Sequence, residues 1–285
     1  MVIFTEIDNG GIDMQGEQVR LMVIGAHPDD CELSAGGLAA KYRSLGRRVK
    51  FVYATNGDAG HHEIGGAKLA EIRAEEVRRA CAVADIEYQI LDIHDGMLEA
   101  NLSNREKFIC LIREFRPDII ITHRTNDYHP DHRNTGILVQ DSSYLIGVPN
   151  ICPQVPCLRE QPVILYAHDF FTVPVEFKAD IVIDIDDVFD VKTEIAGCHR
   201  SQFYEWLPWI DKEFGDIPEA ESERAQWLKG KFSKEDEKIA ERFRSLLIDK
   251  YGPERGSKVK CAEAFQVSEY GGPLTDEKRA IFFPF

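Results

Sequence analysis

Histidine and aspartate are concentrated in two short segments, residues 27–30 and 129–132. The segments read His27-Pro28-Asp29-Asp30 and His129-Pro130-Asp131-His132. Imidazole nitrogens and carboxylate oxygens are ligands of zinc, and a catalytic zinc keeps one position open for water. The two segments therefore predict one metal site assembled from both.

The spacing within each segment fits this hypothesis. His27 and Asp30 are three residues apart across a proline turn and could point at one ion, with an aspartate between them that lies close without coordinating. Pro130 suits the first position of a helix, which makes His129 the cap residue and puts His132 in the first turn. A helix N-terminus disfavours a protonated imidazole, so His132 can stay a neutral ligand. The same terminus could help to stabilise an oxyanion.

Each segment follows an apolar stretch that predicts a buried strand, residues 19–26 and 119–122. Between them, strands and helices alternate as in a parallel sheet with right-handed crossovers. If the strand order is the common 3-2-1-4, the first and fourth strands are neighbours at the point where the order reverses. The two histidine and aspartate segments then meet at one edge of the sheet.

The remaining predicted elements extend this pattern. Further strands are expected at residues 2–7, 49–54, 88–93, 163–170 and 181–185, and helices at residues 33–45, 67–84, 105–115, 130–144 and 188–200. Four prolines in residues 146–162 predict a loop or an irregular lobe. We expect an α/β fold with a Rossmann-like, mostly parallel sheet and helices on both faces. It forms a single domain, with residues 1–205 as the core and residues 206–285 as a helical, charged C-terminal extension packed on it.

Composition and charge limit the possible partners and cellular locations of the protein. A net charge of −15 argues against nucleic acid, which calls for a basic surface. The seven cysteines lack a CxxC pair and are typical of reduced thiols. The first residues are acidic where a signal peptide is basic. No stretch of the sequence reaches the roughly 18 apolar residues of a membrane span. We expect a cytoplasmic protein that does not insert into a membrane. The apolar tail 281–285 either docks on the body or contacts a partner chain, as in a homo-oligomer.

Each candidate also has a plain structural interpretation. His27 can cap a turn, paired aspartates can cap a helix, and His129 and His132 can belong to a solvated loop. The coincidence of all of them at matching strand ends favours a site. His61 and His62, after the second strand, are candidates for substrate contact or plain surface residues. His123 is expected near the site as a supporting residue. Trp206 and Trp209 could form the floor of a sugar pocket, belong to the core or contact another subunit.

The first segment, with Glu32 and Gly36-Gly37, resembles the AHPDD signature of the PIG-L/LmbE-like zinc de-N-acetylases, and the second resembles that family's second motif. Softer matches are Thr55-Asn56-Gly57-Asp58, Ile72-Arg73 with Glu76, Arg116-Pro117-Asp118 and His199-Arg200-Ser201-Gln202. Together they span roughly residues 20–205. The resemblance implies a Rossmann-like fold and removal of an N-acetyl group from an N-acetylglucosamine-type sugar or glycoconjugate, which releases acetate and a free amine.

By matching position, the resemblance implies that His27, Asp30 and His132 hold Zn²⁺. Asp29 is then the general base, and His129 stabilises the oxyanion or acts as general acid. Zinc lowers the pKa of its water and polarises a carbonyl, which agrees with this assignment. The expected substrate contacts are Arg73, His61, His62 and Asp131; for Arg73, a salt bridge with Glu76 or another acid is the alternative.

Other functions stay open. The same ligands would serve a zinc-dependent deacylase or esterase that acts on a non-sugar substrate. A catalytically silent relative that binds sugar or metal would be expected to lose part of the His/Asp set. A receiver domain also places an acidic pair after its first strand, but it leaves His129 and His132 unexplained. Residues 146–162 and 206–285 match no motif, so the sequence does not select the substrate.

Overall fold

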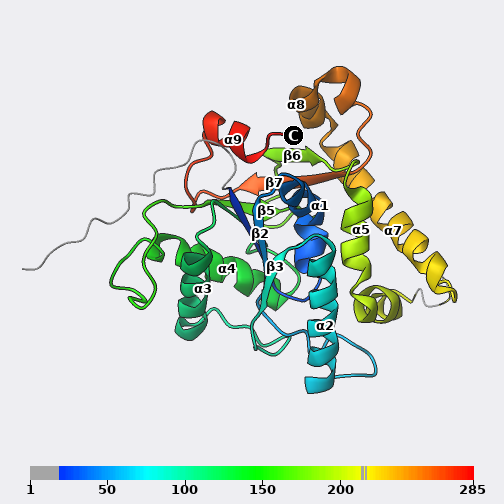
Figure 1. Cartoon of the computed structure of the whole chain (residues 1–285), viewed down its shortest axis with the longest axis horizontal. Helices are drawn as coiled ribbons and strands as arrows, with labels where there is room; N and C mark the ends of the chain where they lie inside the picture. The colour runs from blue at the N-terminus through cyan, green and yellow to red at the C-terminus, as the bar shows by residue number, and fades with distance from the viewer. Residues whose placement is uncertain (1–18, 213–214, 216) are drawn as a thin grey trace, which may run out of the picture.

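The computed structural model describes residues 19–212, 215 and 217–285, so the strand expected at residues 2–7 lies outside the described part of the chain. The described residues form one α/β domain around a seven-stranded sheet with the order β3-β2-β1-β4-β5-β7-β6 (Figure 1). The strands are β1 (Arg20–Gly25), β2 (Arg48–Tyr53), β3 (Glu87–Ile90), β4 (Ile119–Thr122), β5 (Val163–Ala167), β6 (Ile181–Asp184) and β7 (Ala262–Val267).

The strand order places the two candidate segments side by side. β1 pairs in parallel with both β2 and β4, β2 pairs in parallel with β3, and β4 with β5. The predicted order 3-2-1-4 is therefore confirmed. The carboxyl ends of β1 and β4 are adjacent where the order reverses, which is the usual ligand position in an open parallel sheet.

Helices cover both faces of the sheet, as predicted (Figure 1). They are α1 (Asp30–Ser44), α2 (Ala67–Val83), α3 (Leu102–Phe115), α4 (Pro130–Leu145), α5 (Phe189–Gly197), the π-helix η1 (Gln202–Trp206), α6 (Leu207–Ile210), α7 (Glu221–Arg242), α8 (Arg244–Gly256) and α9 (Asp276–Phe282). Residues 146–162 contain neither helix nor strand, in agreement with the loop or irregular lobe expected there. None of the described helices is both long and apolar enough to cross a bilayer.

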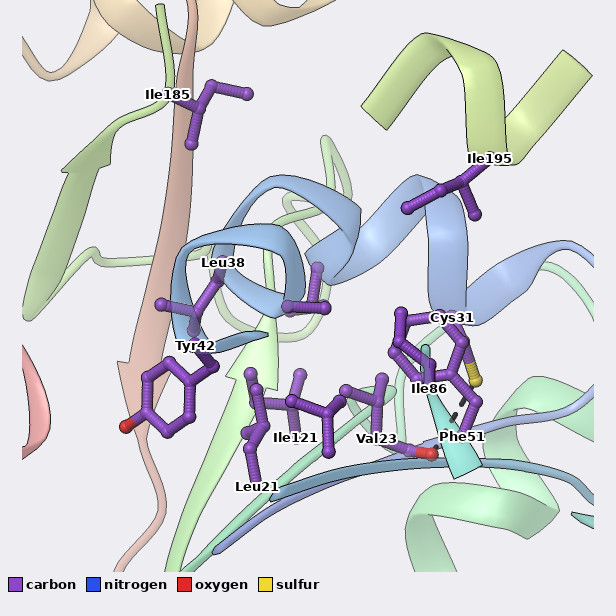
Figure 2. Close-up of a cluster of buried hydrophobic side chains, with 14 of the residues drawn as sticks. Leu21, Val23, Cys31, Leu38, Tyr42, Phe51, Ile86, Ile121, Ile185 and Ile195 are labelled. Atoms are coloured by element: carbon purple, nitrogen blue, oxygen red, sulfur yellow. Dashed lines mark hydrogen bonds between the residues drawn. The ribbon is translucent and has the colours of Figure 1, made fainter. Parts of the chain in front are cut away.

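Alternate residues of β1 feed two separate cores, because successive side chains of a strand point to opposite faces. Leu21 and Val23 pack with α1, α2, α5 and α7 on one face, and part of this cluster is drawn in Figure 2. Met22 and Ile24 pack with α3 and α4 on the other face. Burial on both faces explains why β1 reads as a continuous apolar run.

The C-terminal extension differs from the prediction. Residues 206–285 contain the expected charged helices α7 and α8, but they also contain β7, which lies between β5 and β6 and runs antiparallel to both. The sequence did not predict β7, because this strand contains a charged residue, Glu263, and charged residues are usually exposed. In the structure Glu263 is only 2% exposed. The apolar tail docks on the body, since Phe282 and Phe283 are buried in the core.

Glu263 connects β7 to α1. Helix α1 bends at Ala35, where φ is −150° and ψ is 22°. Just after the bend, the backbone N–H groups of Gly37 and Leu38 donate to the two carboxylate oxygens of Glu263, each at 2.8 Å. A glycine is needed at position 37, because a Cβ there would lie 2.7 Å from Ile185 and 3.0 Å from the Glu263 carboxylate.

Lys192 of α5 balances the charge of Glu263. Its Nζ lies 3.1 Å from Oε1 of Glu263 and donates at 2.9 Å to Oδ2 of Asp236 on α7. All three side chains are buried. A buried ion pair is costly to break on one side, because the remaining charge is left without compensation.

We therefore expect Glu263→Ala to lower the free energy of unfolding by about 3–5 kcal/mol, measured by urea denaturation. The control is Glu254→Ala on α8, whose exposed side chain is 3.5 Å from Lys258 and should change stability little. Equal stabilities for the two variants would contradict a structural role for the Glu263 network.

Candidate metal centre and active site

The site lies where β1 and β4 end. The loop after β1 carries His27 and Asp29, and α1 starts directly with Asp30. The loop after β4 leads into α4, which His129 caps and in whose first turn His132 lies. Helix α1 thus begins three residues earlier than the predicted position 33, which brings Asp30 into its first turn.

Asp30 binds groups from both loops. Its Oδ2 accepts hydrogen bonds from the backbone N–H of Ala26 at 2.9 Å and of His27 at 2.7 Å. The same oxygen lies 3.3 Å from Nε2 of His123 and 3.5 Å from Nε2 of His132. Burial alone would raise the pKa of Asp30, but the charges of His132 and His123 and the side-chain interactions with His123 and His27 hold this pKa well below its usual range. His123 thus lies beside the site, as expected.

Three side-chain atoms from the two segments form a nearly equilateral triangle. Nδ1 of His27 lies 3.4 Å from Oδ2 of Asp30 and 3.2 Å from Nε2 of His132, and the last two atoms are 3.5 Å apart. Bonds of about 2.0–2.1 Å in a tetrahedral zinc site put ligand atoms about 3.3–3.4 Å apart. These three atoms could therefore hold a metal ion almost without moving.

Other groupings at the same place also have ligand geometry. Three sets of side chains bring their donor atoms within 4.8 Å of one another, namely His27 with His129 and His132, Asp30 with His123 and His132, and His27 with Asp95 and Asp131. His27 or His132 belongs to every set. The metal candidates therefore form one cluster at the ends of β1 and β4.

Carboxylates lie behind the two histidines of the triangle. Nδ1 of His132 is 3.1 Å from Oδ1 of Asp127. Nε2 of His27 is 3.1 Å from Asp95 and 3.4 Å from Asp131, without hydrogen-bond geometry to either. A carboxylate behind a metal-binding imidazole fixes its tautomer and orientation, so Asp127 is well placed to orient His132.

Asp131, a predicted substrate contact, binds the backbone of the loop after β3. Its side chain is fully buried, and its carboxylate accepts hydrogen bonds from the backbone N–H of Gly96 at 2.6 Å and of Leu98 at 3.2 Å. These contacts place Asp131 to hold residues 96–98 next to His27, and its role as a substrate contact stays a prediction.

Asp29 is buried beside the triangle in a backbone conformation that is rare for a residue with a side chain. Its φ is 145°, a value that persists only where the surroundings enforce it. Oδ2 of Asp29 accepts a hydrogen bond of 2.6 Å from Nε2 of Gln202. Burial, together with the charge of Asp30, raises the pKa of Asp29 to about 6. The carboxylate next to the metal candidates is thus the more basic of the pair.

His129 presents one particular nitrogen to the site. Its Nδ1 accepts a hydrogen bond of 3.2 Å from the backbone N–H of Asp131, so the neutral ring carries its proton on Nε2. Its ring is 4.5 Å from that of His27, edge to face. Burial and the charges of His27 and His132 lower the pKa of His129. A neutral donor at this place could stabilise an oxyanion.

The loop after β2 covers Pro28. Gly57 has a φ of +67°, and a Cβ at this position would lie 2.9 Å from the Pro28 ring, so a glycine is required for the close approach. In this loop, Nε2 of His61 is 2.9 Å from Glu205, and its Nδ1 accepts from the backbone N–H of Glu63. His61 therefore has partners on both ring nitrogens within the protein.

His61 is the first ring of an aromatic stack. Its ring lies 4.5 Å from that of His62, which lies 5.3 Å from Trp209, and Trp209 lies 5.4 Å from Trp206. This stack joins the loop after β2 to η1 and α6. Trp209 thus packs against His62, which the sequence singled out as a substrate candidate, and Trp206 packs on Trp209.

The segment 199–202 contacts three acidic residues, Glu32, Glu76 and Asp29. Nε2 of His199 is 2.8 Å from Glu32, which also accepts from the Tyr53 hydroxyl at 2.7 Å. The backbone N–H and the hydroxyl of Ser201 donate to Glu76 at 2.7 and 2.6 Å. Gln202, the last residue of this segment, donates to Asp29. The matched segments around Arg73 and Glu76 and at residues 199–202 therefore meet beside the Asp29 carboxylate.

The family model described as PIG-L, GlcNAc-PI de-N-acetylase, matches residues 22–142. The diacetylchitobiose deacetylase of Thermococcus kodakarensis is 30% identical over 202 residues, which cover 67% of this chain and 74% of that protein. The chain belongs to the PIG-L family.

Two further matches show the range of this family. The structure of the N,N'-diacetylchitobiose deacetylase from Pyrococcus horikoshii has the same fold, with a TM-score of 0.67 and 22% identity over 91% of this chain and 88% of that one. The 4-oxalmesaconate hydratase of Pseudomonas putida is 24% identical over 68% of this chain and 78% of that protein. The PIG-L fold thus occurs in relatives with two different reaction names.

Two residues near the PIG-L site carried too weak a signal in the sequence. Asp95 follows β3 and contacts His27, but one acid after a strand is common. Gln202 belongs to a matched segment, yet nothing in the sequence tells that this segment folds back onto Asp29. The contact spans 173 positions of the chain, which local patterns cannot report.

We expect Asp127→Asn to weaken metal binding about 10–100-fold, because an amide orients the His132 ring less firmly than a carboxylate. The affinity for Zn²⁺ is measured by competition with a chromogenic chelator. Asp249→Asn on the exposed face of α8 is the control. An unchanged affinity in Asp127→Asn would show that Asp127 does not orient a ligand.

Proposed function

We propose that this chain is a Zn²⁺-dependent hydrolase that removes the N-acetyl group from an N-acetylglucosamine-type sugar, with His27, Asp30 and His132 as the metal ligands. The observation that carries this proposal is the triangle of donor atoms, with edges of 3.2–3.5 Å, next to the buried Asp29. The donor set of two imidazoles and a carboxylate fits zinc and leaves a fourth position for water or substrate.

A bound Zn²⁺ would lower the pKa of water and polarise the acetamide carbonyl. Asp29 is placed to accept a proton from the attacking water and to return it to the leaving nitrogen, so that acetate and a free amine result. Nε2–H of His129 is placed to donate to the carbonyl oxygen as negative charge develops there. The burial of Asp29 and the hydrogen bond that Nδ1 of His129 accepts support these roles.

The substrate class is supported by relatives. The relative from Thermococcus kodakarensis is a diacetylchitobiose deacetylase, and another, from Bacillus cereus, is a probable N-acetyl-alpha-D-glucosaminyl L-malate deacetylase. All seven cysteines are free thiols, which supports a reducing compartment, and we propose the cytoplasm.

The first test measures metal content and amine release together. The purified protein should bind about one Zn²⁺ per chain and release amine from N-acetylglucosamine or N,N'-diacetylchitobiose. Asp29→Asn should keep the metal and lose about 10²–10⁴-fold in kcat, because it removes the proton acceptor. Asp249→Asn is again the control.

Each contrary result has a clear meaning. Bound metal without amine release would move the reaction to other acyl substrates or to hydration. Failure to bind Zn²⁺ would refute the metal site itself. Full activity in Asp29→Asn would refute its role as the base.

A second test separates the alternative ligand sets. His132→Ala should lose the metal, because His132 supplies one corner of the triangle. His129→Ala should keep it and lower kcat about 10²–10³-fold through loss of a donor to the oxyanion. Metal analysis of the two variants decides, and loss of Zn²⁺ in His129→Ala would instead favour the set of His27, His129 and His132.

A further inference from the structure

Asp29 is joined to α2 by a chain of two hydrogen bonds. Nε2 of Gln202 donates to Oδ2 of Asp29 at 2.6 Å, and Oε1 of Gln202 accepts from Nη2 of Arg73. The same guanidinium nitrogen donates to the backbone carbonyl of Gly60 at 2.7 Å. Arg73 is 1% exposed, and Gln202 and Asp29 are also buried. This chain of hydrogen bonds therefore runs through the protein interior.

Arg73 determines which end of the Gln202 amide faces Asp29. A guanidinium can only donate hydrogen bonds, whereas a side-chain amide has a donor end and an acceptor end. The oxygen of the amide must therefore face Arg73, so its NH₂ group must face the carboxylate. A 180° flip of the amide would place a carbonyl oxygen against the Asp29 carboxylate and an NH₂ group against the guanidinium, and both contacts would be repulsive.

The backbone around Gln202 is fixed on both sides. Ser201 bonds to Glu76 through its N–H and its hydroxyl, and His199 contacts Glu32. Glu76 and Arg73 lie three residues apart on α2 and therefore on one face of that helix. Helix α2 thus holds both the main chain and the side chain of this segment in place.

We propose that Gln202 is a positioning residue that fixes the Asp29 carboxylate by donating to Oδ2, and that Arg73 serves the reaction by orienting the Gln202 amide. This inference rests on the proposed role of Asp29 as the base. Since Oδ2 is held at 2.6 Å, the carboxylate cannot rotate freely, and the second oxygen keeps one direction. Arg73 then acts through Gln202 and not as a contact of the substrate.

The first measurement is steady-state kinetics of Gln202→Leu, which keeps the side-chain volume and removes the donor. We expect kcat for amine release to fall about 10–100-fold, as for other lost supports of a site residue, with KM and Zn²⁺ content unchanged. Gln226→Leu on α7, an exposed position, is the matched control. A raised KM with an unchanged kcat would overturn the proposal, because it indicates contact with the substrate.

The second measurement tests coupling. If Gln202 acts through the Asp29 carboxylate, Gln202→Leu causes no further loss of kcat in an Asp29→Asn background. Arg73→Lys should lower kcat in the same direction and be non-additive with Gln202→Leu. Full additivity in either pair would overturn the proposal.

The third measurement does not depend on activity or on the stability of the leucine variant. A hydrogen bond to a carboxylate at this distance should shift one side-chain amide proton of Gln202 downfield in the ¹H–¹⁵N spectrum. The resonance is assigned by its absence in Gln202→Asn, and it should move in Asp29→Asn. A resonance that stays in place would overturn the inference. A shifted resonance without amine release would support the contact and refute the proposed function.

Discussion

One carboxylate oxygen, Oδ2 of Asp30, connects the two halves of the site. It accepts the N–H groups of Ala26 and His27, and it lies within 3.5 Å of imidazoles that follow β4. An oxygen shared in this way fixes the turn after β1 and the distance between the two loops at once. The triangle of donor atoms has its dimensions because both loops meet at this atom.

A second constraint acts near the middle of α1. The bend at Ala35 allows the later part of the helix to present two N–H groups to Glu263, while the first turn keeps Asp30 in the site. Helix α1 is thus held by carboxylates at two places, by Asp30 in its first turn and by Glu263 of β7 just after its bend. Residues in the last part of the chain therefore support the geometry around the metal candidates.

Much of the site could be predicted from the sequence, and the reasons are physical. Apolar strands, helix-start residues and the alternation of elements are local features, so they predicted the first four strands. With the common order 3-2-1-4 assumed, they also predicted that His27 and His132 are neighbours. Gln202 and β7 could not be found in this way, because each depends on a contact between distant parts of the chain. Glu263 argued against a strand at the position of β7, because the sequence does not distinguish a buried carboxylate from an exposed one. Only the structure shows that Lys192 and the N–H groups of α1 surround it.

The position of β7 affects how the chain can fold during synthesis. β6 is made before β7, but its place in the sheet is defined only by pairing with β7, and β7 in turn pairs with β5. A ribosome-bound chain that has reached α5 can assemble β1 to β5, whereas β6 must wait until about eighty more residues have emerged. The edge of β5 stays open during this interval, and such an edge can pair with other chains. On the β5 side of the sheet, the order of synthesis thus differs from the order of the strands. A nascent molecule needs protection from pairing with other chains at this edge.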